Sequence, residues 1–220
     1  MIRTHTSKLS KVLLIAVLAL PFLTAGCRGA RWFMYVLMPW TGEKSVAAEF
    51  TGLKNHSVAV VIYADEGTQY QYPYVQLNLG ALIANELVNK VKGVTTTDPL
   101  NVISYQRQNV RWDEMDRTAI GKALGAQYVL CVTLVEFATV EKGYLDLIRG
   151  RITAEASLYK VDLPERKACL WREKDIRVVF PDRPTARIGN NEEIFRLAAM
   201  RRFVRILVRN FYAHKVEEKP

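Results

Sequence analysis

Apolar side chains from residue 57 onward follow, in alternation, the spacings of buried strands and amphipathic helices. Residues 57–63 form a continuous, largely β-branched run, which is typical of a strand covered on both faces. Residues 65–67 then predict a break in regular structure. Residues 74–91 place apolar side chains at intervals of three and four, which predicts an amphipathic helix that ends at Gly93.

The middle of the chain predicts two more strands separated by a short helix. Residues 100–104 are predicted as a short second strand. Residues 116–124 are predicted as a helix, with Asp116 as its N-cap and Gly125 as its stop. Residues 127–137 predict a long central strand.

The last part predicts two antiparallel strands and a long helix. Residues 149–161 alternate as a sheet solvated on one side requires, and residues 168–180 are also rich in strand formers. Residues 181–191 predict a loop, and residues 192–214 a helix. The apolar face of this helix is formed by Leu197, Met200, Val204, Leu207 and Phe211. The expected fold is therefore one α/β (α+β) domain with a mixed sheet: a β-α-β-α-β core, an antiparallel meander and a long C-terminal helix.

The first 26 residues have the pattern of an export signal. A basic stretch, residues 1–11, precedes an apolar stretch, residues 12–22, and small residues follow at positions 24–26. The apolar stretch has about half of the roughly 20 residues that a membrane-spanning helix needs. We therefore expect residues 1–26 to be a signal peptide that is removed.

The segment Leu23-Thr24-Ala25-Gly26-Cys27 resembles a lipobox, after which palmitate and other acyl chains attach the protein to a membrane through Cys27. It departs from the usual pattern, because Thr24 stands where Leu is common. An ordinary secretory signal followed by a chance cysteine is the alternative. Arg28 follows Cys27, so the Asp that retains many such proteins in the inner membrane is absent, which favours the outer membrane.

Residues 27–55 are expected to form the lipid anchor and an aromatic tether. Residues 32–40 are rich in Trp, Tyr and Phe, and two interpretations remain open: this segment lies at the membrane surface, or it packs on the domain as an arm. The expected domain covers residues 56–214 and faces the periplasm, and residues 215–220 form a charged tail. The 220 residues, half of them apolar, are enough for one hydrophobic core.

The formal charge of +9 raises the question of a nucleic-acid partner. Three of the basic residues lie in the leader, and without them the chain has 28 basic and 22 acidic residues. Nucleic-acid binding proteins usually show basic stripes and aromatic stacking residues, which are not apparent here, so no nucleic-acid partner is expected.

Two cysteines, Cys131 and Cys169, remain beside Cys27. Both fall in apolar, strand-like runs. They can form a disulfide if their Cα atoms lie within about 7 Å, or they can remain buried thiols; both interpretations stay open.

Five segments between residues 57 and 180 resemble an α/β domain of envelope lipoproteins. They read HSVAVVIYAD, ALIANEL, TAIGKALGAQYVLCVTLVEF, RGRITAEASLYKVD and CLWREKDI. The domain is shared by curli-secretion (CsgG-type) lipoproteins, the N-terminal part of TolB and the LpoB-like activators of penicillin-binding proteins. Curli-type channels carry long inserts, whereas residues 138–149 are only long enough for a turn. The resemblance implies a periplasm-facing domain that contacts other proteins.

No motif for catalysis, a cofactor or a metal stands out. The sequence has three histidines and none of the usual metalloprotease, hydrolase or phosphate-loop motifs. Asp113, Glu114 and Asp116 cluster before a helix and can be considered as oxygen ligands of a cation, but helix capping explains them more simply. We therefore expect no enzyme activity, no cofactor and no metal.

Two groups of residues are candidate partner or ligand surfaces. Tyr70, Tyr72 and Tyr74 can form an aromatic surface for a glycan or peptide, or can pack against the first helix. Arg201, Arg205 and Arg209 repeat every four residues on the last helix and can attract an acidic partner or lipid, or can form a solvated face.

The expected function is that of a lipid-anchored scaffold or adaptor in a cell-envelope machine for assembly, secretion or transport. Such a protein acts by binding envelope proteins, with self-association as a further mode. The alternative is an envelope lipoprotein that binds a glycan or small molecule.

Overall fold

The computed structural model describes residues 43–189 and 191–217. The signal peptide, Cys27 and the aromatic segment 32–40 lie outside the described residues. Ser45–His214 forms one compact unit, and the described residues 43–44 and 215–217 fall outside it. In the described chain, β1 (Glu43–Val46) pairs with β7 (His214–Glu217) in a two-stranded sheet. The sequence did not predict this pair of strands.

The larger unit is built on a five-stranded sheet in the order β3-β2-β4-β5-β6. The strands β2 (Ser57–Tyr63), β3 (Thr95–Thr96) and β4 (Tyr128–Val140) are parallel. β5 (Leu147–Lys160) and β6 (Cys169–Ala186) continue the sheet antiparallel, with the short helix α7 (Glu165–Ala168) between them. The mixed-sheet α/β fold is thus confirmed.

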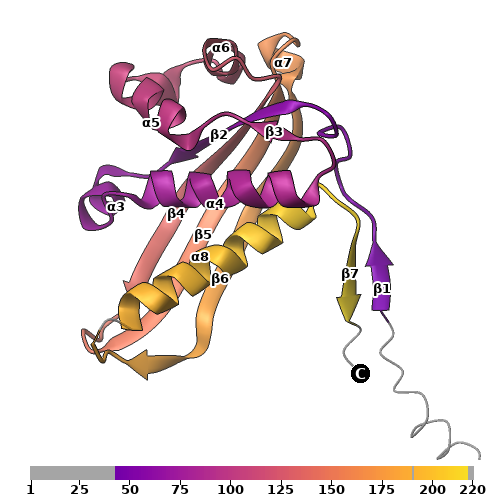
Figure 1. The fold of residues 1–220 in the computed structure, drawn as a ribbon. Coiled ribbons are helices and arrows are strands. Elements are labelled where there is room, and N and C mark those ends of the chain that lie inside the picture. The colour runs from indigo at the N-terminus through magenta and orange to yellow at the C-terminus, as the bar shows by residue number, and fades with distance from the viewer. Residues whose placement is uncertain (1–42, 190, 218–220) are drawn as a thin grey trace, which may run out of the picture. The chain divides into compact units, whose positions relative to one another are not determined.

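Two helices cover one face of this sheet. α4 (Val75–Lys90) and α8 (Asn191–Arg209) cross in front of the strands in Figure 1. α4 turns its buried side chains toward the sheet at the helical spacing that the sequence showed. α8 does the same with Met200, Phe203, Val204 and Leu207, which join one hydrophobic cluster with the inward side chains of β2, β4, β5 and β6.

The other face carries a smaller cluster under α5 (Pro99–Gln108), the 3₁₀ turn η1 (Trp112–Glu114) and α6 (Arg117–Ala123). Val61 and Val129 point to this face and contact Val102, Ile120 and Val161. Asp116 caps α6 by accepting a hydrogen bond from the Thr118 backbone N–H, with a distance of 2.9 Å. Gly125 follows with a φ of 66°, so the predicted start and stop of this helix are confirmed.

The predicted strand at residues 100–104 is wrong, because this segment lies in α5. Asp98 accepts a hydrogen bond from the Leu100 N–H at 2.8 Å, and Pro99 occupies the first turn. Val102 and Gln106, one turn apart, are the buried residues. The second strand of the predicted β-α-β-α-β order is instead β3, which lies at the edge of the sheet. With two residues it was too short to show an apolar pattern.

Two further boundaries differ from the sequence prediction. β6 continues to Ala186, which pairs with Leu147, so most of the expected loop 181–191 is strand. α8 ends at Arg209, and His214 belongs to β7 rather than to the helix. In addition, α3 (Glu66–Gln71) occupies the predicted break after β2. None of the described helices has the length and hydrophobicity that a membrane span requires.

Cys131 and Cys169 lie on strands that are separated by β5. Cys131 pairs with Ser157 and Cys169 with Tyr159. Two strand spacings of about 4.8 Å place their Cα atoms roughly 9.6 Å or more apart, beyond the reach of a disulfide. Both are free thiols, Cys169 exposed and Cys131 partly buried. Burial raises the pKa of the Cys131 thiol to about 12.

We expect the two thiols to differ in reactivity. At pH 8 Cys131 stays protonated, so a maleimide should label Cys169 within minutes and reach Cys131 only after denaturation. Peptide mass mapping of the labelled protein measures this. A peptide that joins the two residues by a disulfide would contradict the strand arrangement.

The close approach of β5 to α8 can be tested at Gly150. A Cβ built there comes within 2.7 Å of the Ala199 Cβ and 3.1 Å of the Phe180 carbonyl oxygen. Gly150→Ala should therefore lower the free energy of unfolding by about 1–3 kcal/mol, measured by urea denaturation. Gly80→Ala in α4 is the matched control: its Cβ meets Ile62 at 3.7 Å, and Ala favours the helix by about 1 kcal/mol, so stability should rise. Equal effects at both positions would contradict this packing.

Candidate functional site

The three tyrosines of the predicted aromatic surface are separated by the fold. α3 begins at the N-cap Asp65, and the turn that follows leads into α4. Tyr70 and Tyr74 have exposed fractions of 91% and 65%, whereas that of Tyr72 is 6%. The Tyr72 ring packs edge-on against Phe137, with 4.9 Å between the ring centroids. Only Tyr70 and Tyr74 are therefore available to a ligand or partner.

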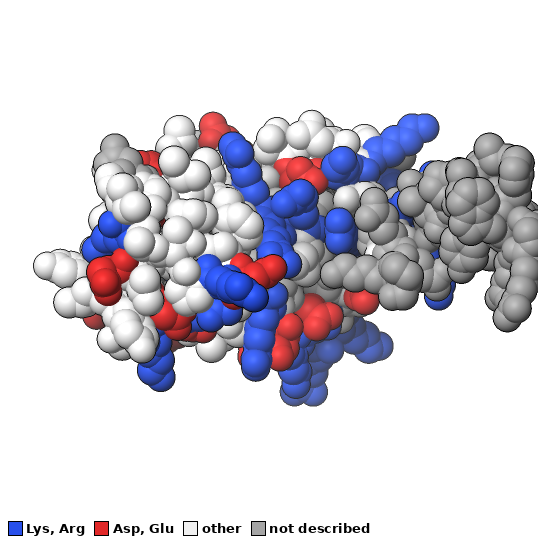
Figure 2. Space-filling view, turned by 90° about the horizontal axis from the view of Figure 1, so that it is seen from below, with Lys and Arg blue, Asp and Glu red and all other residues white. Residues whose placement is uncertain are grey.

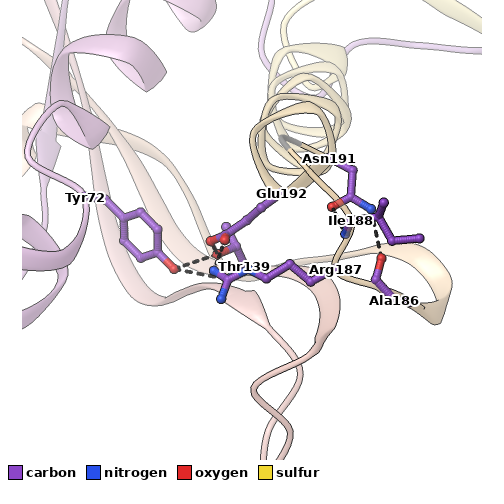
Figure 3. A network of polar contacts seen from close by, with 7 residues as sticks. All are labelled: Tyr72, Thr139, Ala186, Arg187, Ile188, Asn191 and Glu192. Atoms are coloured by element: carbon purple, nitrogen blue, oxygen red, sulfur yellow. Dashed lines mark hydrogen bonds and ion pairs between the residues drawn. The ribbon is translucent and has the colours of Figure 1, made fainter.

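The Tyr72 hydroxyl belongs to a polar network that joins four segments of the chain (Figure 3). It lies 2.9 Å from the Thr139 Oγ1 and accepts a hydrogen bond from the Thr139 N–H at 3.2 Å. The Thr139 hydroxyl in turn donates to the carboxylate of Glu192, which forms an ion pair with Arg187. The network thus connects the α3–α4 turn, the end of β4, the segment directly after β6 and the start of α8.

The first residue of α8 adds contacts to the same end of the helix. The Asn191 Oδ1 accepts a hydrogen bond from the Ile188 N–H at 3.0 Å, and its Nδ2 donates to the Ala186 carbonyl at 2.9 Å. Partial burial by itself would raise the pKa of Glu192, but the Thr139 hydrogen bond and the hydrogen bond and charge of Arg187 lower it below the ordinary value. The position of the α8 N-terminus is therefore fixed by polar contacts as well as by packing.

This network does not provide a catalytic pair. The Thr139 hydroxyl and the Glu192 carboxylate have the contact expected of a nucleophile and a base. Thr139, however, has an exposed fraction of 1%, and its oxygen already contacts Tyr72. A substrate cannot approach it without displacing the surrounding structure, so we assign the network a structural role.

Two hollows lie between α4 and α8 and together form what we call the inter-helix groove. The smaller, with a volume of about 80 Å³, lies beside Tyr74 and is lined by Asn78, Phe137, Arg196 and Met200 among others. The larger, with a volume of about 350 Å³, is lined by Ala81, Leu82, Asn85, Glu193 and Leu197 as well. The groove therefore has a partly apolar lining with one basic and one acidic side chain.

A third hollow lies on the other flank of α8, and we call it the arginine ledge. Its volume is about 310 Å³, and it is lined by Phe180, Ile194, Leu197, Ala198, Arg201, Arg202 and Arg205. Ile194 is 66% exposed and Leu197 38%, although Leu197 was predicted on the buried face. Figure 2 shows Lys and Arg side chains crowded across the middle of the face seen from below, with Asp and Glu among them.

The arginines of α8 differ in their partners. Arg202 lies 3.5 Å from Asp182 and donates to the Val179 carbonyl, and Arg196 lies 3.6 Å from Glu193. Arg201, Arg205 and Arg209, the three predicted from their spacing, are exposed and have no ion-pair partner in the described ranges 43–189 and 191–217. The ledge brings Arg201 and Arg205 together, while Arg209 lies one turn further along.

The residues of the network and the apolar floor of the ledge were not found from the sequence. Thr139 and Glu192 stand 53 positions apart and carry no motif, so no local pattern could pair them. Phe180 was placed at the end of a predicted strand. A usable signal was present in Ile194 and Leu197, which follow each other at helical spacing just before the arginines.

The acidic cluster before α6 has local partners. Glu114 forms an ion pair with Arg111, and Asp116 caps α6. Arg117 donates hydrogen bonds to the carbonyl of Asp113 at 2.8 Å and to that of Trp112 at 3.2 Å. Within the part of the chain that the structure describes, no group of three or more acidic, His or Cys side chains is arranged to hold a metal ion.

No protein-family model and no curated protein matches this chain. Solved structures with a similar arrangement include a PelC variant dodecamer from Paraburkholderia phytofirmans, with 12% sequence identity and a TM-score of 0.44; the match covers 78% of this chain and 98% of that one. Another is the lipoprotein GNA1162 from Neisseria meningitidis, with 15% sequence identity and a TM-score of 0.42; this match covers 69% of this chain and 98% of that one. A third is the hypothetical protein CT253 from Chlamydia trachomatis, with 11% sequence identity and a TM-score of 0.41; the match covers 71% of this chain and 97% of that one. TM-scores below 0.5 support no functional argument, so the resemblance to CsgG, TolB and LpoB-like domains stays a prediction.

The polar network predicts a pH-dependent stability. Because the pKa of Glu192 is lower in the folded than in the unfolded protein, its contribution is present above the unfolded value of about 4.3 and is lost as the pH falls through the folded value. Glu192→Gln should reduce stability at pH 7 and flatten the dependence of stability on pH below about 5. Urea denaturation at several pH values measures this effect.

The neighbouring Glu193 provides the control. Its side chain is 75% exposed, and its partner Arg196 lies 3.6 Å away, so Glu193→Gln should leave both stability and its pH dependence nearly unchanged. If the two variants behave alike, the network does not hold the start of α8.

Proposed function

We propose that this protein is a lipid-anchored scaffold or adaptor of the cell envelope, acting by protein binding in an assembly, secretion or transport machine. Acyl chains on Cys27 hold it to a membrane, and the α/β domain binds other envelope proteins. Arg28 after the cysteine favours the outer membrane, with the domain in the periplasm. The protein makes and breaks no bond in this function, because tethering and recognition are sufficient.

The observation that carries the proposal is the exposed side of α8. It combines exposed apolar side chains, Ile194 and Leu197, with Arg201 and Arg205, which have no ion-pair partner among the residues that the structure describes. Apolar residues next to arginine are common at protein interfaces, because arginine adds both hydrogen bonds and contact area.

The lipid anchor supports the proposal from the sequence side. Each buried methylene contributes about 0.8 kcal/mol, so two or three acyl chains hold a protein firmly where one chain does not. A tethered domain meets membrane-bound partners at a high effective concentration, and modest contact areas then suffice for stable assembly.

A second candidate is an envelope lipoprotein that binds a glycan or small molecule. The exposed Tyr70 and Tyr74 favour it, since Tyr74 borders a hollow of the inter-helix groove. That hollow has a volume of about 80 Å³, whereas pockets for drug-sized ligands usually have about 300–1,000 Å³. Stabilisation of the domain by added glycans or small molecules would favour this candidate over the scaffold.

The anchor is tested by Cys27→Ser in cells grown with labelled palmitate. The wild-type protein should incorporate the label and sediment with membranes, and the variant should do neither after export. Cys169→Ser is the matched control and should behave as the wild type, since Cys169 lies in the folded domain. Wild-type protein without label would overturn the anchor.

The binding function is tested in the same cells. Crosslinking followed by affinity purification should recover defined envelope proteins with the wild type and fewer of them with Cys27→Ser. Recovery of no envelope protein with either would overturn the scaffold function.

A further inference from the structure

We propose that the arginine ledge binds an acidic segment of a partner protein, with two carboxylates about 6 Å apart beside one apolar side chain. This inference rests on the proposed scaffold function and specifies the chemistry of its partner. It concerns the flank of α8 that bears Arg201 and Arg205; Leu197 lies between this hollow and the inter-helix groove and lines both.

The shape of the ledge is suited to a side chain. Phe180, Ile194, Leu197 and Ala198 provide an apolar floor for a hollow of about 310 Å³. Release of water from this floor on insertion of a leucine or phenylalanine side chain favours binding, because both surfaces are apolar.

The charge of the ledge is suited to carboxylates. Arg201 and Arg205 have no acidic partner in the described ranges, and Arg202 has only Asp182, at 3.5 Å on an exposed side chain. Positions four apart on a helix are separated by about 6 Å along its axis. Two carboxylates match this distance when they stand four apart on a partner helix or two apart on an extended segment. Each guanidinium can then bind one carboxylate with two parallel hydrogen bonds.

The ledge favours a peptide over an anionic bilayer. A helix that binds a membrane inserts a continuous apolar face to a depth of about 5–10 Å. Here the apolar residues form a hollow, and the arginines stand at its rim. Asp182, the partner of Arg202, has 88% of its side chain exposed beside the ledge, and its carboxylate would repel anionic headgroups. A partner with few charges can avoid this acid, whereas a charged plane cannot.

The ledge is also rigid, which lowers the cost of binding. The start of α8 is fixed by the Tyr72–Thr139–Glu192 network, and its underside packs on Gly150 at close distance. The Phe180 ring lies against Phe195 of the helix, with 6.0 Å between the ring centroids. The helix backbone is therefore held in place before the partner binds, and the ordering cost at the ledge falls mainly on the exposed arginine side chains.

The test uses the full chain in its native cells, with a photoreactive benzoylphenylalanine in place of Ala198 at the floor of the ledge. Irradiation should give a protein adduct, and mass mapping should place the crosslink in a segment with two carboxylates two, three or four residues apart. Combining the probe with Arg201→Glu and Arg205→Glu should reduce the adduct at least tenfold. The matched charge reversal, Arg107→Glu with Lys122→Glu on α5 and α6, should change it less than twofold.

Every other result overturns the inference. An adduct with lipid alone would assign the ledge to the membrane, and an adduct with a second copy would assign it to self-association. A protein adduct that lacks the paired carboxylates, or that survives the reversal of Arg201 and Arg205, would show that charge does not select the partner. No adduct at all would show that the ledge is unoccupied.

A second probe separates failure of the ledge from failure of the scaffold function. Val135 is 62% exposed on β4, away from the ledge, and can carry the same photoreactive residue. An envelope-protein adduct at position 135 without one at position 198 would retain the scaffold function and overturn the ledge. Absence of adducts at both positions, together with the absence of crosslinked partners described above, would overturn both.

Discussion

The close packing of α8 on the antiparallel part of the sheet is the constraint on which the rest of the domain depends. At Gly150 the helix and β5 approach so closely that a Cβ would meet Ala199 at 2.7 Å. This contact lets Phe203, Val204 and Leu207 reach the core between β5, β6 and α4. Once that face is buried, helical geometry leaves Arg201 and Arg205 on the outside, so the packing of the core also determines which charges face a partner.

The polar network at the start of α8 restricts how this helix can slide or rotate on the sheet. Apolar contacts alone allow a helix to slide or rotate at modest cost, because they are not directional. The chain of contacts from Tyr72 through Thr139 to Glu192 fixes one end of the helix relative to β4 and to the α3–α4 turn. The contact between Tyr72 and Thr139 is costly to break, since both buried groups would lose a partner away from water. The surface proposed for binding thus lies on α8, whose position is fixed both by apolar packing and by the polar network.

The functional argument combines two parts of the chain that differ in kind. The segment around Cys27 lies outside the described residues, and in the proposed function it contributes location, which chemistry at a single sulfur can provide. In the same proposal the domain contributes recognition through exposed apolar and basic groups on α8. Of the exposed Tyr70 and Tyr74, Tyr74 borders the smaller hollow of the inter-helix groove. For such a protein, what it binds and where it is held describe the function together.

The sequence by itself determined the elements whose signals are local: the β-branched run of β2, the spacing in α4, and the cap and stop of α6 at Asp116 and Gly125. It also gave the arginine repeat of α8. The tertiary structure alone decided that residues 100–104 belong to a helix, that β6 extends to Ala186 through pairing with Leu147, and that Tyr72 is buried while Tyr74 is not. It also separated Cys131 from Cys169 by a strand and brought Thr139 to Glu192. These outcomes depend on contacts between residues far apart in the chain, and periodicity describes only the relation of a residue to its near neighbours.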